Sequence, residues 1–531
     1  MTRTRTDEFR VKTNLRKQAA KRKRKRQKQL AELKRKIQRR LDKKKNDQDR
    51  GRVFSPGKIV YEISQKSKGV IGGGIGLIHA MVQKLALAEA IDRRVHVLMM
   101  HRPYHESDHV LNIAYNCLLG GTCLDDIELR RNDENYLNLF GAARIPDPTT
   151  EGDFCRRFDE DSIYHLQLAY DETRLKVWEQ QPDEFFEEAI VDCDGTLTET
   201  TGECKQGMDY CKHKRAWGYL PLLVSLANTG EALRIVNRPG NRPSHEDAAG
   251  SIDDVVELMQ GAGFRRILFR GDTDFSQTEH LDRWDDEENV FFVFGYDAKE
   301  NLQILADELF PDAWRELRRR EKPPIKTEPR LRPDNVKQPL VVEYEFENIR
   351  LVKEEIAEFD YQPAACNRPY RMVVVKKHLI HEKGQEFLFE NYKYFFYITN
   401  KRDVSAEEIV FLANDRCNQE NLIEQLKNGV RSLQAPVDNL QSNWAYMVMA
   451  SLAWNLKAWA ALLLPEEPGR WQQRRRDEKR TVLRMHFKTF VNYFIQIPCQ
   501  LVRTGRQTIL RVMNWNPWQP VFFRLANVLN C

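Results

Sequence analysis

Carboxylates close two apolar stretches of this sequence, and another carboxylate lies in a polar stretch with helical spacing. Residues 188–196 read EAIVDCDGT, residues 266–275 read RILFRGDTDF, and residues 414–427 read NDRCNQENLIEQLK. Alternation along a strand puts Asp192 and Asp194 on the same side, so one of them can reach a site at the strand end. With Asp272 or Asp274, and with Glu420, they could hold divalent metal ions, which prefer oxygen ligands.

Such a site suits phosphodiester chemistry, because two bound Mg²⁺ ions can activate the attacking oxygen and stabilise the leaving oxygen. The helix that presents Glu420 is expected to begin at a capping box formed by Ser405 and Glu408 and to continue through the Glu420 stretch. Arg416 and Lys427 are expected on the same helical face as Glu420, because Arg416, Glu420 and Lys427 are four and seven residues apart.

The order of elements around the first two stretches predicts an α/β core. Strands are expected at 190–194, 219–227, 232–236, 267–270 and 290–294, with helices at 244–259 and 276–284. This is the element order of the ribonuclease H-like fold. In that fold the first and fourth strands lie side by side, so Asp194 and Asp272 are expected to be neighbours.

The charge distribution separates a basic arm from a slightly acidic body. The chain has 531 residues and a formal charge of +6, but residues 1–52 hold 23 Lys or Arg against 6 Asp or Glu, about +17. Such an arm binds polyanions, most simply nucleic-acid phosphates. Apolar residues at helical spacing predict a short amphipathic helix there, and a solvated tail is the alternative. They are Leu30, Leu33, Ile37 and Leu41.

The remaining regions differ in composition. We expect a helical, DNA-binding amino-terminal region at 53–185, the core at 186–296 and 401–465, a β-rich inserted subdomain at 297–400 and a basic helical region at 466–531. The glycine-rich stretch 69–76 is interpreted as a turn before a helix at 77–90, because no Lys-Ser or Lys-Thr follows it. The apolar stretch 444–464 is interpreted as a core helix and not a membrane span, since Asn455 and Lys457 interrupt it.

Basic pairs in two of these regions are candidate DNA contacts. They are Arg156 and Arg157 in the amino-terminal region, and Arg474 and Arg475 in the carboxy-terminal region. The ten cysteines form no C-x-x-C pair, which favours reduced thiols and no zinc site.

Three motifs in fixed order carry a family resemblance. They read D-x-D-x-T from Asp192, R-x-D-T-x-F from Arg270 and N-x-R-x-x-x-E-N-x-I-E-x-x-K-N-G from Asn414. Together they resemble the DDE transposases of bacterial insertion sequences, in the branch with a β insertion before the catalytic Glu. The resemblance covers roughly residues 100–520. One departure is Ala413, where related sequences have Tyr.

The resemblance implies a metal-binding catalytic triad of Asp194, Asp272 and Glu420, holding two Mg²⁺ ions for which Mn²⁺ substitutes. Arg416 and Lys427 would hold DNA phosphates. Three further side chains could support the triad: Asp192, Asp274 and Asn421. For Asp192 and Asp274, a solvated position at a strand end is the preferred expectation.

By the same resemblance, the enzyme would act as a homodimer that bridges two double-stranded DNA ends. Water would attack at the terminal inverted repeat, and the freed 3′-OH would attack the opposite strand to give a hairpin. After the hairpin opens, the 3′-OH would attack target DNA. The implied location is the bacterial cytoplasm, at the nucleoid.

A second family shares the first motif. D-C-D-G-T-L at 192–197 matches the phosphoaspartyl signature of haloacid dehalogenase-like phosphotransferases, with Asp192 as nucleophile and Asp194 as acid/base. That mechanism needs a Lys shortly before the second acidic motif, and none occurs between Lys214 and Asp272. It also assigns no role to Glu420.

Overall fold

A computed structural model gives the fold of the chain. It describes residues 21, 24–39, 69–100, 103–319, 337–384, 386–466, 468–504 and 507–530. Most of the predicted basic arm, including Leu41, and the segment 320–336 lie outside the described residues.

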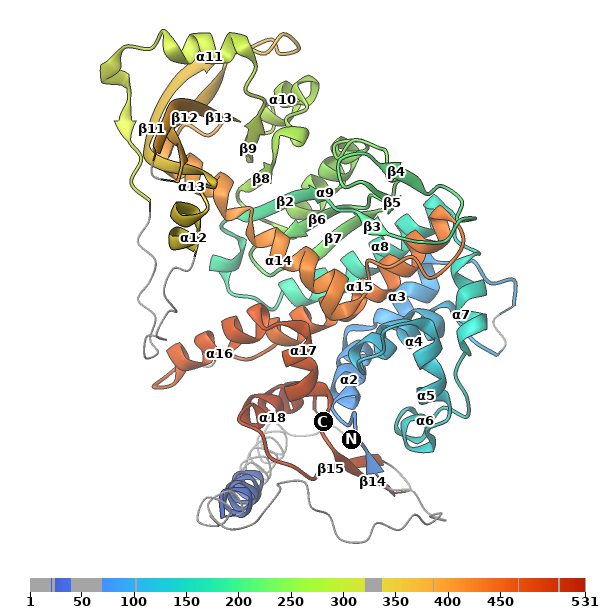
Figure 1. Cartoon of the computed structure of the whole chain (residues 1–531). Helices are drawn as coiled ribbons and strands as arrows, with labels where there is room; N and C mark the ends of the chain where they lie inside the picture. Colours follow the sequence, from blue (N-terminus) through green and yellow to red (C-terminus); the bar gives the residue numbers. More distant parts are fainter. Residues whose placement is uncertain are drawn as a thin grey trace, which may run out of the picture.

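A central sheet of mixed direction organises the molecule (Figure 1). Its core strands are β2 (Ala189–Gly195), β6 (Leu222–Leu226), β7 (Glu231–Val236), β8 (Ile267–Gly271) and β9 (Val290–Tyr296). They lie in the order β7-β6-β2-β8-β9, with β2 antiparallel to β6 and parallel to β8. This is the ribonuclease H-like order, and the predicted pairing of the first and fourth strands is confirmed.

Helices cover both faces of this sheet because successive residues of its strands point in opposite directions. Ile267 and Phe269 of β8 pack in the same cluster as helix α9 (Ala248–Ala262), whereas Leu268 packs with helix α13 (Ala406–Asp415). Helix α10 (Thr278–Asp285) follows β8. A small second sheet contains β3 (Thr198–Glu199), β4 (Asp209–Cys211) and β5 (Ala216–Tyr219).

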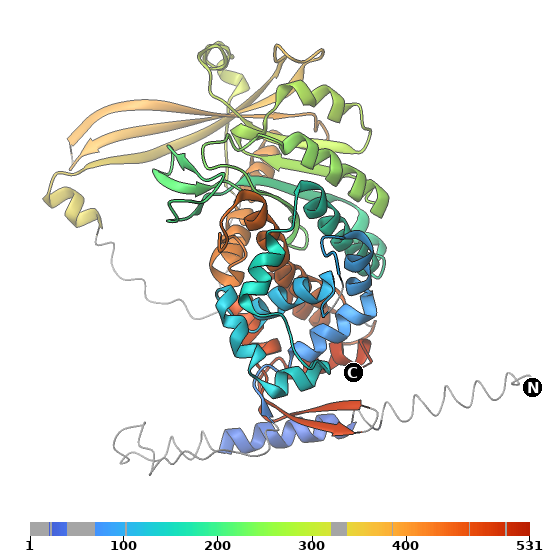
Figure 2. The same cartoon turned by 90° about the vertical axis from the view of Figure 1, so that its right-hand side faces the viewer.

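The insertion is rich in β structure as expected, and its strands extend the central sheet instead of forming a sheet of their own. They are β10 (Arg315–Glu316), β11 (Glu347–Tyr361), β12 (Tyr370–Lys383) and β13 (Glu386–Thr399). The end of β13 pairs antiparallel with β9, whose outer edge is otherwise open. Figure 2 shows the long strands projecting beyond the core. Two helices, α11 (Glu300–Asp307) and α12 (Lys337–Glu343), precede β11.

The amino-terminal region is helical from residue 75 to residue 178. Its α-helices are α2 (Ile75–Leu85), α3 (Leu87–Arg94), α4 (Glu106–Leu118), α5 (Ile127–Arg131), α6 (Glu134–Phe140), α7 (Pro148–Cys155) and α8 (Glu160–Trp178). The helix expected at 77–90 is broken at Ala86, which takes a left-handed conformation with φ of 56°. A Cβ atom at Gly74 would lie 1.8 Å from the Phe494 carbonyl oxygen. The glycine-rich stretch is therefore a tightly packed turn after β1 (Gly69–Val70).

Helix α15 (Leu440–Leu462) belongs to the second part of the core. The carboxy-terminal region has the expected helices, α16 (Gln472–Arg484), α17 (Phe487–Phe490) and α18 (Gln519–Val528), and also the hairpin β14 (Cys499–Thr504) and β15 (Gln507–Val512). The hairpin pairs with β1, which the helical interpretation of both regions missed. Helix α15 is buried against α4, α8 and β7. Among the described residues, no helix is long and apolar enough to cross a membrane.

Candidate active site

Asp194 and Asp272 lie side by side at the ends of two parallel strands. Asp192 of β2 is level with Arg270 of β8, the last pair of that register, and Asp194 and Asp272 each follow two residues further on. Adjacent strands are about 4.8 Å apart. Asp272 caps a short 3₁₀ turn, Thr273–Phe275, and its Oδ1 accepts a hydrogen bond of 3.0 Å from the Asp274 backbone N–H. Asp274 is exposed and supports Asp272 through its backbone.

Burial and like charges make these carboxylates hard to ionise. Burial raises the pKa of Asp194 to about 6, the carboxylates of Asp272 and Glu420 add to the rise, and the Arg416 guanidinium opposes it. Burial also raises the pKa of Asp272, with the same opposition from Arg416. Arg416 NH1 lies 3.4 Å from Asp194 Oδ2, and both side chains are mostly buried. The end of β2 therefore concentrates negative charge around one guanidinium.

The predicted long helix through Glu420 is interrupted. Ser405 caps α13 by accepting a 3.2 Å hydrogen bond from the Glu408 N–H, as expected, but α13 ends at Asp415. Helix α14 (Asn418–Glu424) presents Glu420 in its first turn, and a π-helix (Gln425–Val430) follows. Arg416, Glu420 and Lys427 therefore do not share one regular helical face. Lys427 instead donates a 2.6 Å hydrogen bond to the Leu197 carbonyl, just beyond β2.

Gln419, next to Glu420, is a buried side chain whose importance the sequence did not reveal. Its Nε2 lies 2.9 Å from the Asp192 carbonyl, 3.1 Å from the Leu223 carbonyl and 3.1 Å from Ser225 Oγ. These contacts fasten α14 to β2 and β6, and so fix where Glu420 stands. Asn421 is exposed and lines a cavity of about 930 Å³ whose lining does not include Glu420.

Asp192 is not at a solvated strand end, so that expectation is wrong. It is buried, and it accepts two hydrogen bonds from Arg270, Nε to Oδ1 at 2.7 Å and NH2 to Oδ2 at 2.8 Å. Alternation along the strand correctly predicted the side of β2 on which Asp192 lies. It could not predict that Arg270 of the neighbouring strand pairs with Asp192. A carboxylate enclosed in this way is poorly placed to attack a substrate phosphate, which argues against the phosphoaspartyl mechanism.

The other basic candidates lie on exposed helix surfaces. Arg156, at the end of α7, pairs with Asp438 and Asp153 at 2.9 Å each, and Arg157 beside it is exposed. Arg474 and Arg475 lie on α16, where Arg474 pairs with Glu478 at 3.0 Å.

The donor chemistry suits a hard divalent cation, because the site offers carboxylate oxygens that repel one another. Within the described residues, no three such side chains are close enough to enclose an ion by themselves. Mg²⁺ does not require this, since it is usually bound by one or two carboxylates together with substrate phosphates and water. Asp194 and Asp272 are the two carboxylates that could serve as such a pair, with Glu420 close enough to influence the pKa of Asp194.

Residues 70–531 match the family of transposase DDE domains, group 1. The chain belongs to this family of DDE transposases. No curated protein sequence matches it. Among solved structures, the transposase is similar to a piggyBac transposase in a synaptic complex with hairpin DNA, with 10% sequence identity and a TM-score of 0.36 over 86% of this chain and 85% of that one.

Membership identifies the protein as a DNA transposase, and DDE transposases generally use divalent metal ions. The family match includes all three strand and helix stretches that carry Asp194, Asp272 and Glu420.

Proposed function

We propose that this transposase cuts DNA at the terminal inverted repeats of its own mobile element and joins the freed 3′ ends to target DNA. Asp194, Asp272 and Glu420 are the proposed metal-binding triad. The observation that carries the proposal is the gathering of carboxylates at the ends of β2 and β8, where burial, together with the charges of Asp272 and Glu420, raises the pKa of Asp194 to about 6. Neighbouring buried carboxylates such as Asp194 and Asp272 favour a cation beside them.

The proposed cofactor is a pair of Mg²⁺ ions, with Mn²⁺ as a substitute. When bound, such ions activate the attacking oxygen and stabilise the leaving 3′ oxygen. Arg416 is the counter-charge of Asp194, and we propose that it transfers to a DNA phosphate when the cation neutralises the carboxylates. Lys427, fixed near the end of β2, is placed to attract the same strand.

The remaining features of the proposal come from the family resemblance of the motifs. The cut ends would pass through hairpins, and two copies of the chain would bridge two DNA ends. Arg156, Arg157, Arg474 and Arg475 are proposed to contact the DNA backbone outside the active site. The amino-terminal helical region, 53–185, is proposed to take part in holding the inverted repeats.

The decisive experiment is cleavage of a duplex that carries the inverted repeat flanking the gene, with Mg²⁺ present. We expect Asp194→Ala, Asp272→Ala and Glu420→Ala each to reduce cleavage by a factor of about 10³ or more while duplex binding persists. Asp274→Ala is the matched control, because it removes an exposed carboxylate and leaves the backbone N–H that holds Asp272. It should retain most of the activity.

Hairpin products in the same gel would support the hairpin route, and open ends alone would contradict it. Cleavage that survives Glu420→Ala would remove Glu420 from the triad. Cleavage that survives all three substitutions would refute the proposed site.

A further inference from the structure

The amino-terminal helix at residues 24–39 is strongly basic and lies against the carboxy-terminal end of the chain. It holds eight Lys or Arg and a single acidic residue, Glu32. We infer that this helix, held on α18, is a binding surface for duplex DNA that is separate from the active site. The inference rests on the proposed function, because it assigns a binding surface to DNA that lies away from the cleavage site.

The side of the helix that faces α18 is defined by its burial. Arg26, Leu30, Leu33 and Ile37 are half-buried, whereas their neighbours on the helix are exposed. Their spacings of four, three and four residues form one stripe along a helix. Within the described residues, the apolar stripe expected from the sequence is therefore the side on which the helix docks.

Polar and aromatic contacts fix this docking. Arg26 NH1 donates a 2.8 Å hydrogen bond to Asn527 Oδ1, and its guanidinium lies 5.2 Å from the Phe523 ring centroid. Lys34 Nζ lies 5.4 Å from the Trp515 ring centroid. Both distances are within the range of cation–π contacts. Basic side chains at two points along the helix are thus committed to the carboxy-terminal region.

The opposite side of the helix is left to solvent and carries most of the charge. Its exposed basic residues are Arg24, Lys25, Lys28, Arg35, Lys36 and Arg39. None of these six forms an ion pair within the described part of the chain. The helix spans about 24 Å at 1.5 Å per residue, which equals roughly seven base pairs at 3.4 Å each. Its outer face therefore presents a rigid row of cations on the scale of a duplex backbone.

Helix α18 also joins this surface to a second basic helix. Arg524 of α18 forms an ion pair with Glu478 of α16, and Figure 1 shows α18 between α16 and the amino-terminal helix. Arg480 and Arg484 of α16 are exposed. Figure 2 shows the amino-terminal helix beside the β14–β15 hairpin. The two ends of the chain thus combine into one basic surface.

The chemistry of this surface favours a duplex over a single strand. Proteins that bind single strands place aromatic rings among the basic residues so that bases can stack on them. Residues 24–39 contain no aromatic side chain, and Phe523 and Trp515 are already covered by Arg26 and Lys34. What remains exposed is cationic, and it matches the phosphate charge that duplex DNA presents along its length.

The test measures binding of the full-length protein to a fluorescent duplex of random sequence across a range of NaCl concentrations. We expect Lys28→Ala/Arg35→Ala to lower the slope of log K against log salt by about 2, at roughly 0.9 per phosphate contact. The corresponding loss of affinity near physiological salt should be at least tenfold. The matched control is Lys299→Ala/Arg318→Ala, which removes two exposed charges near the insertion. It should change neither quantity appreciably.

A second variant separates a docked helix from a free cationic tail. Leu30→Ser/Leu33→Ser keeps every charge but removes two half-buried apolar side chains of the stripe that includes Arg26. We expect its affinity to fall although its net charge is unchanged. Affinity equal to wild type in this variant, or in Lys28→Ala/Arg35→Ala, would overturn the inference. So would equal competition by single-stranded DNA or by RNA of the same length.

Failure of the inference about the amino-terminal helix can be distinguished from failure of the proposed function. At low salt and saturating protein, the helix variants should still cut the inverted-repeat duplex, whereas the triad variants should bind DNA and not cut it.

Discussion

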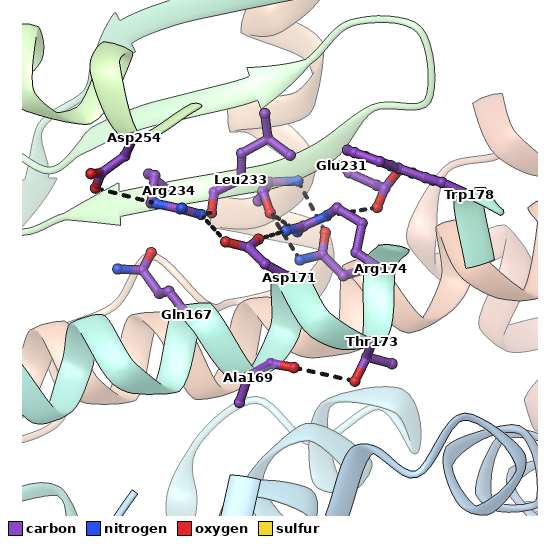
Figure 3. Close-up of polar contacts among 12 residues, drawn as sticks. Gln167, Ala169, Asp171, Thr173, Arg174, Trp178, Glu231, Leu233, Arg234 and Asp254 are labelled. Atoms are coloured by element: carbon purple, nitrogen blue, oxygen red, sulfur yellow. Dashed lines mark hydrogen bonds and ion pairs between the residues drawn. The ribbon is translucent and has the colours of Figure 1, made fainter. Parts of the chain in front are cut away.

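Two regions of this transposase bury charge, and they balance it differently. Figure 3 shows the first, where helix α8 meets strand β7. Arg174 Nε donates to Glu231 at 3.0 Å and also pairs with Asp171, while Arg234 NH1 lies 2.7 Å from the second Asp171 oxygen. The indole N–H groups of Trp178 and Trp459 donate to Glu231 at 3.0 and 2.7 Å. Two guanidinium groups thus offset the two buried carboxylates, and Arg234 also lies 3.8 Å from the partly exposed Asp254.

The second region, at the ends of β2 and β8, has Asp194 and Asp272 beside Arg416, with the exposed Glu420 close enough to Asp194 to act on its pKa. Here burial and mutual repulsion raise the pKa of Asp194 to about 6. Two strands away in the same sheet, the first region is neutralised internally. The α8–β7 network fastens the helical region to the core, whereas the unbalanced site is the one at which we propose that a cation and DNA bind.

The largest expected effect on stability comes from a substitution in the α8–β7 network. Glu231→Ala leaves Arg174 buried with one partner fewer and removes the acceptor of two indoles. We expect a loss of about 3–5 kcal/mol in the free energy of unfolding. Urea denaturation of the purified protein measures it. Glu231→Gln keeps a hydrogen-bond acceptor in the same volume and should lose less, and a loss below about 1 kcal/mol for the Ala variant would show that the network does not stabilise the fold.

Lys457 extends the comparison to a buried cation without a carboxylate. It donates a 2.7 Å hydrogen bond to the Leu483 carbonyl and lies 3.9 Å from the Trp454 ring centroid, and burial lowers its pKa to about 7. Between about pH 7 and its ordinary pKa near 10.4, the unfolded chain binds the proton that the folded chain has released. The contribution of Lys457 to stability must therefore rise with pH across this window.

We expect Lys457→Met to remove this rise, with a change of about 3–4 kcal/mol between pH 7 and pH 10 relative to wild type. Denaturation at both pH values, expressed as wild type minus variant, cancels the titration of other groups. A difference that stays constant with pH would show that Lys457 keeps its proton in the folded state.

The next effect is a gain of stability at the unbalanced site. Asp194→Asn removes one of the repelling charges, so we expect the metal-free protein at pH 7 to be more stable than wild type by on the order of 1–2 kcal/mol. The same variant should be inactive in DNA cleavage. Thermal unfolding in EDTA measures the gain, with Asp274→Asn as an exposed control. A destabilised Asp194→Asn protein would mean that Arg416 already compensates the carboxylates in full.

The comparison also explains what the sequence could reveal. Apolar runs predicted the five core strands and their order, because a strand that is buried on both faces of a sheet consists mostly of apolar residues. The pairing of Asp194 with Asp272 followed from that order. The junction of β13 with β9 depended on an open sheet edge, and the partner of Asp192 depended on register between two strands. Neither is visible in a local pattern.

Interruptions of helices were the other feature that could not be predicted from the sequence. Residues 406–430 have helical periodicity throughout, yet the chain turns at Arg416 and Cys417 and widens into a π-helix at Gln425. Insertions of this kind are common at functional sites. Periodicity predicts that a helix forms, but it does not predict one extra residue in a turn. For the same reason the anchoring role of Gln419 could not be separated from that of an exposed polar neighbour.

Gln419 gives the smallest and most specific test, because it acts on Glu420 through the backbone of α14. Gln419→Met keeps the volume of the side chain but loses the contacts with the Asp192 and Leu223 carbonyls. We expect about 1 kcal/mol of lost stability and a cleavage rate lower by roughly tenfold, since small displacements of a reacting group are costly. Asn418→Ala is the matched control, because Asn418 is exposed and bonds only to Asp415 within its own helix region. If Gln419→Met cuts DNA as fast as Asn418→Ala while its stability falls, the side chain supports the fold alone and Glu420 is positioned by other contacts.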